Sequence, residues 1–221
     1  MEIISNHLKK NCDPNLPGIL SLGVKEAYSF LDDLIKKEKI LQRQEMKQTW
    51  GHLRHGLIDV AIKQVLQSSS VQHEIADKTT SRHKNGHTYL MIEVKGAIIT
   101  PAKVCRLNQV PRKAVFRDKG SILNKQFNLF EDQASINSEY DENKLPFLLL
   151  TYGGLNHKLE FVNLGLPEAG VRKWIDHIEI TNAPVLLNNK EEISNDLQLT
   201  FTSEAEKILR GVNNAGEEGA I

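Results

Sequence analysis

Two stretches near the N-terminus repeat apolar residues at intervals of three and four, which is the spacing of an amphipathic helix. The first runs from Val24 to Lys47 and the second from Thr49 to Gln67. Both predict helices that pack one face on a core. Apolar residues also flank the main face of the second stretch, so we expect this helix to be largely buried. That main face consists of Trp50, Leu53, Leu57, Val60, Ala61 and Val65.

Farther along the chain, apolar and polar residues alternate with the period of a β-strand. Residues 71–77 predict one strand, and residues 87–105 predict a hairpin that turns at Lys95-Gly96. Side chains alternate between the faces of a strand, so Glu93 and Lys95 should share one face. The opposite face of the same strand, formed by Leu90, Ile92 and Val94, should point into the core.

The apolar run FLLLTY, the pair Gly153-Gly154 and the segment LEFVNLGLP predict a second hairpin over residues 146–167. Between the two hairpins, residues 111–128 predict a helix with Pro111 in its first turn. This helix is rich in lysine and arginine. Residues 131–144 are acidic and polar without periodicity, which predicts a loop.

These elements predict an α+β fold, in which two N-terminal helices pack on a mainly antiparallel sheet built from the two hairpins. The basic helix joins the hairpins. Residues 1–22 predict an irregular lead-in, since Pro17 and Gly18 interrupt any periodicity. Residues 23–182 predict a single domain, and residues 183–221 predict a weakly structured extension with one strand and one short helix.

The composition, with 40% hydrophobic and 25% charged residues, is that of an ordinary globular protein. No apolar run approaches the roughly 20 residues that a membrane-spanning helix needs. The first residues lack the basic-then-apolar order of a signal peptide, so the sequence predicts a cytoplasmic protein without a membrane partner. Cys12 and Cys105 lack CxxC spacing and predict neither a disulfide nor a zinc site.

The formal net charge of zero hides an uneven distribution along the 221 residues. Residues 78–130 carry 11 basic and 2 acidic side chains, whereas residues 131–221 carry 7 basic and 16 acidic ones. The basic middle predicts contacts with the phosphates of DNA or RNA. The alternative is that the two regions fold together and neutralise each other. The predicted phosphate-binding side chains are Arg106, Arg112, Lys113, Arg117, Lys119 and Lys125.

Asp77, Glu93 and Lys95 have the order of a PD-(D/E)xK nuclease site. In such a site, two carboxylates, here Asp77 and Glu93, hold a divalent metal such as Mg²⁺, and the lysine stabilises charge on the phosphate. The sequence departs from the pattern in two ways. Ala76 replaces the usual proline, and these nucleases follow the ExK strand with a helix, whereas here a second hairpin strand comes first. The alternative is a solvated strand face.

His52, His55 and Asp59 are spaced i, i+3 and i+7 on the second helix, so they fall within about 60° of one another. Such a polar stripe on an otherwise apolar helix predicts metal ligation or proton transfer. The alternative is a hydrogen-bonded His–Asp pair at the surface. Arg54, beside His55, adds a phosphate ligand to the same stretch.

The order of WGHLRHGLID (50–59), NQVPRKAVFR (108–117) and LEFVNLGLP (159–167) resembles an uncharacterised family of small bacterial proteins. That family is associated with mobile-element, defence and toxin–antitoxin loci. The resemblance covers residues 49–180 and carries over no catalytic residue. It implies a toxin or defence role.

Three functions follow as alternatives. The first, and the main hypothesis, is a nucleic-acid-associated protein of defence or toxin–antitoxin type that binds DNA or RNA through its basic middle without catalysis of its own. The second is a metal-dependent PD-(D/E)xK-like nuclease or toxin, and only this alternative calls for a cofactor, Mg²⁺. The third is an interaction module that docks an acidic protein such as an antitoxin.

Overall fold

A computed structural model describes residues 3–79, 88–125, 145–154 and 158–185. All of these residues belong to the first of two units into which the chain divides, residues 1–185. Among the described residues, no helix is both long and apolar enough to cross a membrane. The helices of the described residues are α1 (Ile3–Asn11), α2 (Leu16–Lys37), η1 (Gln44–Gln48), α3 (Trp50–Gln67), α4 (Val115–Ser121) and η2 (Ile122–Asn124).

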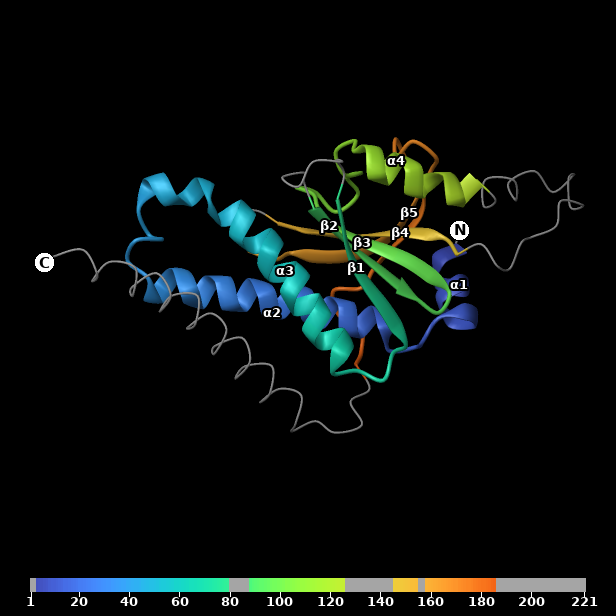
Figure 1. The fold of residues 1–221 in the computed structure, drawn as a ribbon, viewed down its shortest axis with the longest axis horizontal. Coiled ribbons are helices and arrows are strands. Elements are labelled where there is room, and N and C mark those ends of the chain that lie inside the picture. The colour runs from blue at the N-terminus through green and yellow to red at the C-terminus, as the bar shows by residue number, and fades with distance from the viewer. Residues whose placement is uncertain (1–2, 80–87, 126–144, 155–157, 186–221) are drawn as a thin grey trace, which may run out of the picture. The chain divides into compact units, whose positions relative to one another are not determined.

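Six strands of the described chain form one sheet in the order β1-β2-β3-β4-β5-β6. All neighbouring pairs are antiparallel except β3 and β4, which are parallel. The sheet is therefore two antiparallel meanders joined by one parallel pair, and the predicted α+β class with a mainly antiparallel sheet is confirmed (Figure 1). The strands are β1 (His73–Thr79), β2 (Thr88–Val94), β3 (Ala97–Lys103), β4 (Phe147–Gly153), β5 (Phe161–Pro167) and β6 (Trp174–Glu179).

Helices cover both faces of the sheet (Figure 1). On one face, α4 packs on β4, where a Cβ added at Gly120 would come within 2.7 Å of the Phe147 ring. On the other face, Tyr28 of α2 meets Tyr152 of β4 edge to face, with ring centres 6.3 Å apart. Connecting two parallel strands requires a crossover, and α4 lies on that crossover between β3 and β4.

The expectation of an irregular lead-in over residues 1–22 is wrong, because this stretch contains α1 and the start of α2. Pro17 occupies the first turn of α2, where the missing N–H of proline has no helical partner to lose. Gly18 marks close packing rather than a break, since a Cβ there would collide with the carbonyl of Pro184. Asp176 of β6 accepts a 2.9 Å hydrogen bond from the backbone N–H of Ile4 and so holds the start of α1.

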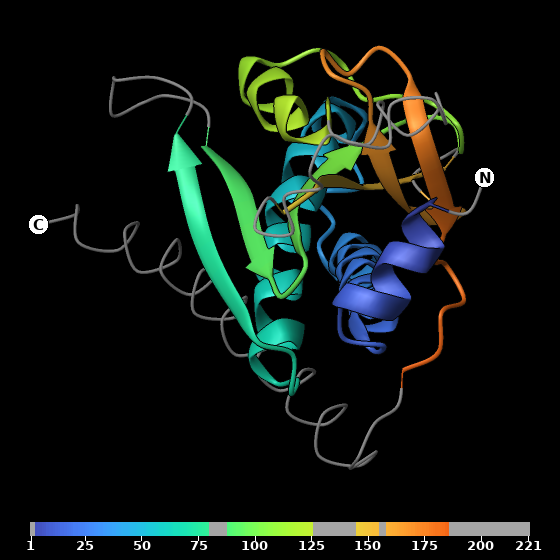
Figure 2. The ribbon, with the colours of Figure 1, turned by 90° about the vertical axis from the view of Figure 1, so that its right-hand side faces the viewer.

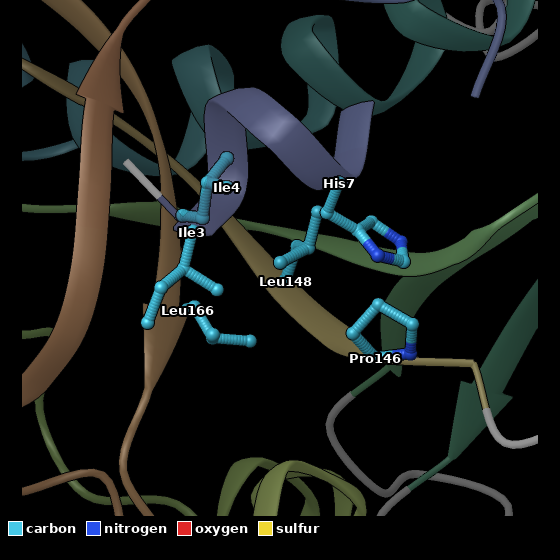
Figure 3. A pocket seen from close by; sticks show the side chains of 6 residues that line it. All are labelled: Ile3, Ile4, His7, Pro146, Leu148 and Leu166. Carbon is cyan, nitrogen blue, oxygen red and sulfur yellow. The ribbon is translucent and has the colours of Figure 1, made fainter. Parts of the chain in front are cut away.

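α1 covers the start of β4 and the end of β5, as Figure 3 shows. Ile3 and Ile4 face Leu148 and Leu166 there, around a gap of about 10 Å³. Such a volume is at the lower limit for one water molecule, and the surrounding side chains are mostly aliphatic. This gap therefore belongs to the packing of α1 and carries no ligand site.

The second predicted helix is correct in its bounds, because α3 runs from Trp50 to Gln67. The predicted buried face is partly wrong: Ala61 and Val65 are buried, but Leu53 and Val60 remain 37% and 38% exposed. Apolar residues nearly encircle this helix, so the periodicity alone does not select one of two adjacent faces. The face that packs against the protein consists of Arg54, Ile58, Ala61, Ile62, Val65 and Leu66.

The basic helix is shorter than the predicted 111–128. Residue Ala114 has an extended backbone, and α4 begins at Val115. The chain is then fixed by Asn124, which is fully buried. Its side-chain Nδ2 donates hydrogen bonds to the carbonyl oxygens of Phe147 and Pro167, and its Oδ1 accepts one from the backbone N–H of Phe147. These three bonds hold the end of the basic segment on β4 and β5, while residues 126–128 and the predicted loop 131–144 lie outside the described residues.

Candidate functional site

The strands β2 and β3 separate before β3 ends. Their ladder stops at the pair Ile92–Ile99, whereas the parallel ladder of β3 with β4 continues to Lys103–Tyr152. The carboxyl ends of β3 and β4 therefore remain paired with each other where β3 is no longer paired with β2. In open sheets with parallel strands, ligands bind at such carboxyl ends. Figure 2 shows the β1–β2 hairpin, drawn in teal and green, turning away from the gold and orange strands β4 to β6.

Pro101 explains why the ladder ends there. The backbone N–H groups of Ile98 and Val104 donate to β4, so the N–H of every odd-numbered residue of β3 points to β2. Pro101 has no N–H and cannot make the next bond to β2. The hydroxyl of Thr100 instead donates a buried 2.7 Å hydrogen bond to the carbonyl oxygen of Leu90. The opening between β2 and β3 thus results from the backbone. The carbonyl oxygen of Leu90 still has a hydrogen-bond donor, the side chain of Thr100.

Arg54 is the largest charged group buried beside this opening, with only 2% of its surface exposed. Its guanidinium carbon lies 4.8 Å from the centre of the Tyr28 ring, a cation–π contact. Burial raises the pKa of Tyr28, while the charge of Arg54 and its hydrogen bond to Tyr28 lower it. Burial likewise raises the pKa of Tyr152, with further contributions from Asp59 and Tyr28. Arg54 is therefore held between helices α2 and α3 and the strand β4.

Lys103, at the end of β3, and Arg117, in the first turn of α4, complete a cationic cluster with Arg54. Partial burial and then the charge of Arg54 lower the pKa of Lys103. Burial also lowers the pKa of Arg117. A lowered pKa in a cation means that its surroundings disfavour the positive charge, and a bound anion would relieve this. These three cations lie near the carboxylate of Asp59, and their partial burial suits the cluster to an anionic ligand.

Arg117 links this cluster to the aromatic side chains under α4. One guanidinium nitrogen, Nη1, donates a 2.8 Å hydrogen bond to the carbonyl oxygen of Arg112. The guanidinium carbon lies 4.8 Å from the centre of the Phe116 ring. The Phe116 ring in turn stacks on Tyr89 of β2, with ring centres 3.9 Å apart and planes inclined by 15°. Phe116 therefore contacts both the guanidinium of Arg117 and the ring of Tyr89.

The structure does not bring Asp77, Glu93 and Lys95 together, so the predicted nuclease site is not assembled. Asp77 pairs with Leu90 in the β1–β2 ladder and shares its face, whereas Glu93 points to the other face of the sheet. Lys95 lies in the turn after β2. The carboxylate of Asp77 instead accepts hydrogen bonds of 2.8 and 2.9 Å from Lys63 of α3. The spacing in the sequence does not determine the register of β1 against β2, and this register decides whether Asp77 and Glu93 share a face of the sheet.

The expected alternation along β2 is confirmed, since Leu90, Ile92 and Val94 are buried and Glu93 is exposed. The strand that precedes the helix, as in PD-(D/E)xK nucleases, is β3 rather than β2. That strand ends at Lys103 and carries Pro101 where the carboxylate would stand. Within the described ranges, no three His, Cys, Asp or Glu residues gather in a way that would hold a metal ion. This end of β3 thus keeps a lysine without the carboxylate that metal-dependent cleavage requires.

Two of the three predicted polar residues of α3, His55 and Asp59, lie near the cationic cluster. Burial, then the charges of Arg117 and His52, lower the pKa of His55. Asp59 lies close enough to Tyr152 to raise its pKa. His52 is exposed beside them. Two of the three residues predicted on α3 thus lie beside this cluster, whereas no local motif indicated Tyr28, Lys103 and Tyr152, which lie on other elements.

Most predicted phosphate-binding residues lie at the surface around this site. Residues 95–125 carry eight basic side chains and one acidic side chain, Asp118. Lys113 lies 3.5 Å from the carboxylate of Asp118, and Arg117 is partly buried as described above. The exposed members of the predicted set are Arg106, Arg112, Lys113, Lys119 and Lys125.

Searches with the sequence and with the structure found no matching family model, no matching curated protein and no matching solved structure. The resemblance to small bacterial defence-associated proteins therefore stays a prediction. The chemistry of the site has to be inferred from its geometry and charge.

We expect the stability of the protein to depend on the titration of His55. Its pKa is lowered in the folded state, so the unfolded state, with a histidine pKa of about 6.5, takes up the proton first as the pH falls. The free energy of unfolding should therefore fall below about pH 6.5, and His55→Gln should remove part of that fall. Urea unfolding at a series of pH values measures it.

His52→Gln provides the control, because it removes only the smallest of the three causes that lower the pKa of His55. It should flatten the pH dependence less than His55→Gln does. Parallel pH profiles for His55→Gln and the parent protein would contradict the assigned environment of His55.

Proposed function

We propose that this protein binds nucleic acid through backbone phosphates, and that it does so without cleaving them. The observation that carries the proposal is the position of Lys103 and Arg117 beside the buried Arg54 at the carboxyl ends of β3 and β4, where the pKa values of Lys103 and Arg117 are both lowered. Nucleic acid supplies phosphates in a regular row, and lysine and arginine contacts to them provide affinity.

The surface around the cluster supports a polyanionic rather than a small anionic ligand. Arg106, Arg112, Lys119 and Lys125 are exposed on the segment that runs from the end of β3 through α4 and η2. No ion pair among the described residues neutralises these four side chains. Several such cations along one segment suit a chain of phosphates better than a single ion.

We propose the absence of catalysis because the end of β3 lacks the carboxylate that a metal-dependent nuclease needs. Pro101 occupies the carboxylate position two residues before Lys103, and Asp77 and Glu93 point to opposite faces of the sheet. A role in defence or in a toxin–antitoxin pair rests on the sequence resemblance alone. The three alternatives from the sequence give different results in a single set of binding experiments.

We expect binding of a labelled DNA duplex to weaken steeply with salt, because bound phosphates release condensed counterions. Replacing Arg112, Lys119 and Lys125 by alanine should reduce the log–log slope by up to about 2.7, that is about 0.9 for each phosphate that is no longer neutralised. Fluorescence anisotropy between about 50 and 200 mM salt measures both slopes. Lys103→Gln should weaken binding further at every salt concentration.

The matched control is the triple replacement of Lys25, Lys37 and Lys39 by alanine. These lysines are exposed on or next to α2, and their removal changes the net charge by the same amount. The control should leave the slope unchanged. An equal reduction of the slope in both triple variants, or the absence of salt-dependent binding to any nucleic acid, would contradict the proposal. Cleavage of the bound DNA in Mg²⁺ would contradict its non-catalytic part.

A further inference from the structure

A groove of about 340 Å³ lies between α4 and the first three strands of the sheet. Its size is at the lower end of the range for small-molecule sites, about 300–1,000 Å³, and suits one nucleobase with its sugar. Its walls combine the aromatic rings of Tyr89, Phe116 and Phe147, aliphatic side chains and one lysine. Residues that line it include Tyr89, Met91, Ile98, Val115, Phe116 and Lys119.

From this groove we infer that the nucleic acid is single-stranded, with one base held in the groove against Tyr89. The inference rests on the proposed function and names the class of its ligand. A base in a duplex hides both faces in the helical stack, whereas a base in a single strand exposes a flat π-face. Aromatic side chains beside a positively charged track are the features that bind single strands without sequence choice.

The contacts of Phe116 with Tyr89 and Arg117 already suit this arrangement. The rings of Tyr89 and Phe116 are nearly parallel, at 15° and 3.9 Å between ring centres, and Tyr89 is half-buried at the groove. A base lying on Tyr89 extends the ring pair, and Phe116 of that pair also contacts the guanidinium of Arg117. The same contacts connect the base to the cationic cluster that is proposed to hold the phosphates.

Exposed apolar surface at the rim points to the same occupant. Val115 lines the groove and is 67% exposed, an unusual position for a large aliphatic side chain next to Lys119 and Arg117. An acidic protein segment would satisfy the lysines but would leave the ring of Tyr89 and the side chain of Val115 without a flat partner. A nucleotide brings both a flat apolar face and a charged phosphate, so it complements both parts of the surface.

The test compares three labelled probes of equal length: oligothymidylate, the same oligonucleotide with all bases removed, and a duplex. The intact single strand should bind about tenfold more tightly than the abasic strand, since stacking of one base on an aromatic side chain contributes about that factor or more. It should also bind more tightly than the duplex. Anisotropy titrations at one fixed salt concentration give these ratios.

Two substitutions at one position locate the base. Tyr89→Leu should weaken binding of oligothymidylate about tenfold and leave binding of the abasic strand unchanged. Tyr89→Phe keeps the ring and should bind oligothymidylate as the parent does. Thermal unfolding of both variants checks that the fold is retained, and the unchanged abasic binding serves as a second check on the folded site.

Equal binding of the strands with and without bases, or equal binding of the duplex, would overturn the inference while leaving the proposed phosphate binding in place. Polyglutamate that displaces oligothymidylate at equal charge concentration would overturn it as well, because the surface would then respond to charge alone. Absence of salt-dependent binding to all three probes would instead be a failure of the proposed function.

Discussion

Replacing Arg54 by alanine should lower the free energy of unfolding by about 3–5 kcal/mol. Arg54 is almost fully buried, and its guanidinium contacts the ring of Tyr28 and hydrogen-bonds to that residue. Its removal leaves a cavity among α2, α3 and β4 and withdraws the positive charge beside the buried Tyr152. Both effects destabilise the folded state, and neither is relieved by solvent.

Urea unfolding, followed by the fluorescence of Trp50 and Trp174, measures this effect. The neighbouring replacement Leu53→Ala is the matched control, because Leu53 lies on the same turn of α3 but is partly exposed. It should cost less than about 1 kcal/mol. If Arg54→Ala and Leu53→Ala destabilised the protein equally, the burial of Arg54 on this face of α3 would be wrong.

Gly153→Ala should destabilise the protein by about 3 kcal/mol, the upper end of the range for an added methyl group in a packed interior. A Cβ at this position would overlap the carbonyl oxygen of Val104, and a backbone atom cannot move aside as a flexible side chain can. Val104 follows Lys103 directly and is bonded to β4 through Tyr152. The substitution therefore pushes the end of β3 away from β4, at the base of the candidate site.

The same chemical change elsewhere should have the opposite sign. Gly56 is exposed in α3, and a Cβ there meets no atom within 4 Å in the described part of the chain. Gly56→Ala should raise the free energy of unfolding by about 0.5–1 kcal/mol, since glycine loses more backbone entropy in a helix than alanine does. Thermal or urea unfolding of the two variants, side by side, gives the comparison. A neutral Gly153→Ala would mean that β3 and β4 are farther apart at this point.

Local patterns in the sequence were sufficient for elements whose partners are near in the chain. The turn at Lys95-Gly96 was predicted from its residues, and Gly96 has the positive φ of 91° that such a turn needs. The alternation over β2 placed Leu90, Ile92 and Val94 correctly in the core. In each case, the covalent chain itself sets which residues meet.

Arrangements that depend on distant partners were not predictable in this way. The apolar residues of α3 allow two neighbouring faces to be buried, and only the packing of α2 selects the face with Arg54. The register of β1 against β2 places Asp77 and Glu93 on opposite faces, a result that one residue of shift would reverse. Lys103 gave no signal because its partners Arg54 and Tyr152 lie about 50 residues away in sequence.

Proline within a strand usually marks an edge or a bulge, yet Pro101 lies in β3, an interior strand of the sheet. On the side that faces β2, β3 nevertheless behaves as an edge strand, because its hydrogen-bonded ladder with β2 ends before Pro101. An opening made by side chains can close again when neighbouring residues mutate and repack. An opening made by an imino acid persists through such sequence drift, because no substitution on β2 supplies the missing N–H donor. The position of the candidate site is therefore set by one backbone feature, the imino acid Pro101, rather than by the side chains that line the site.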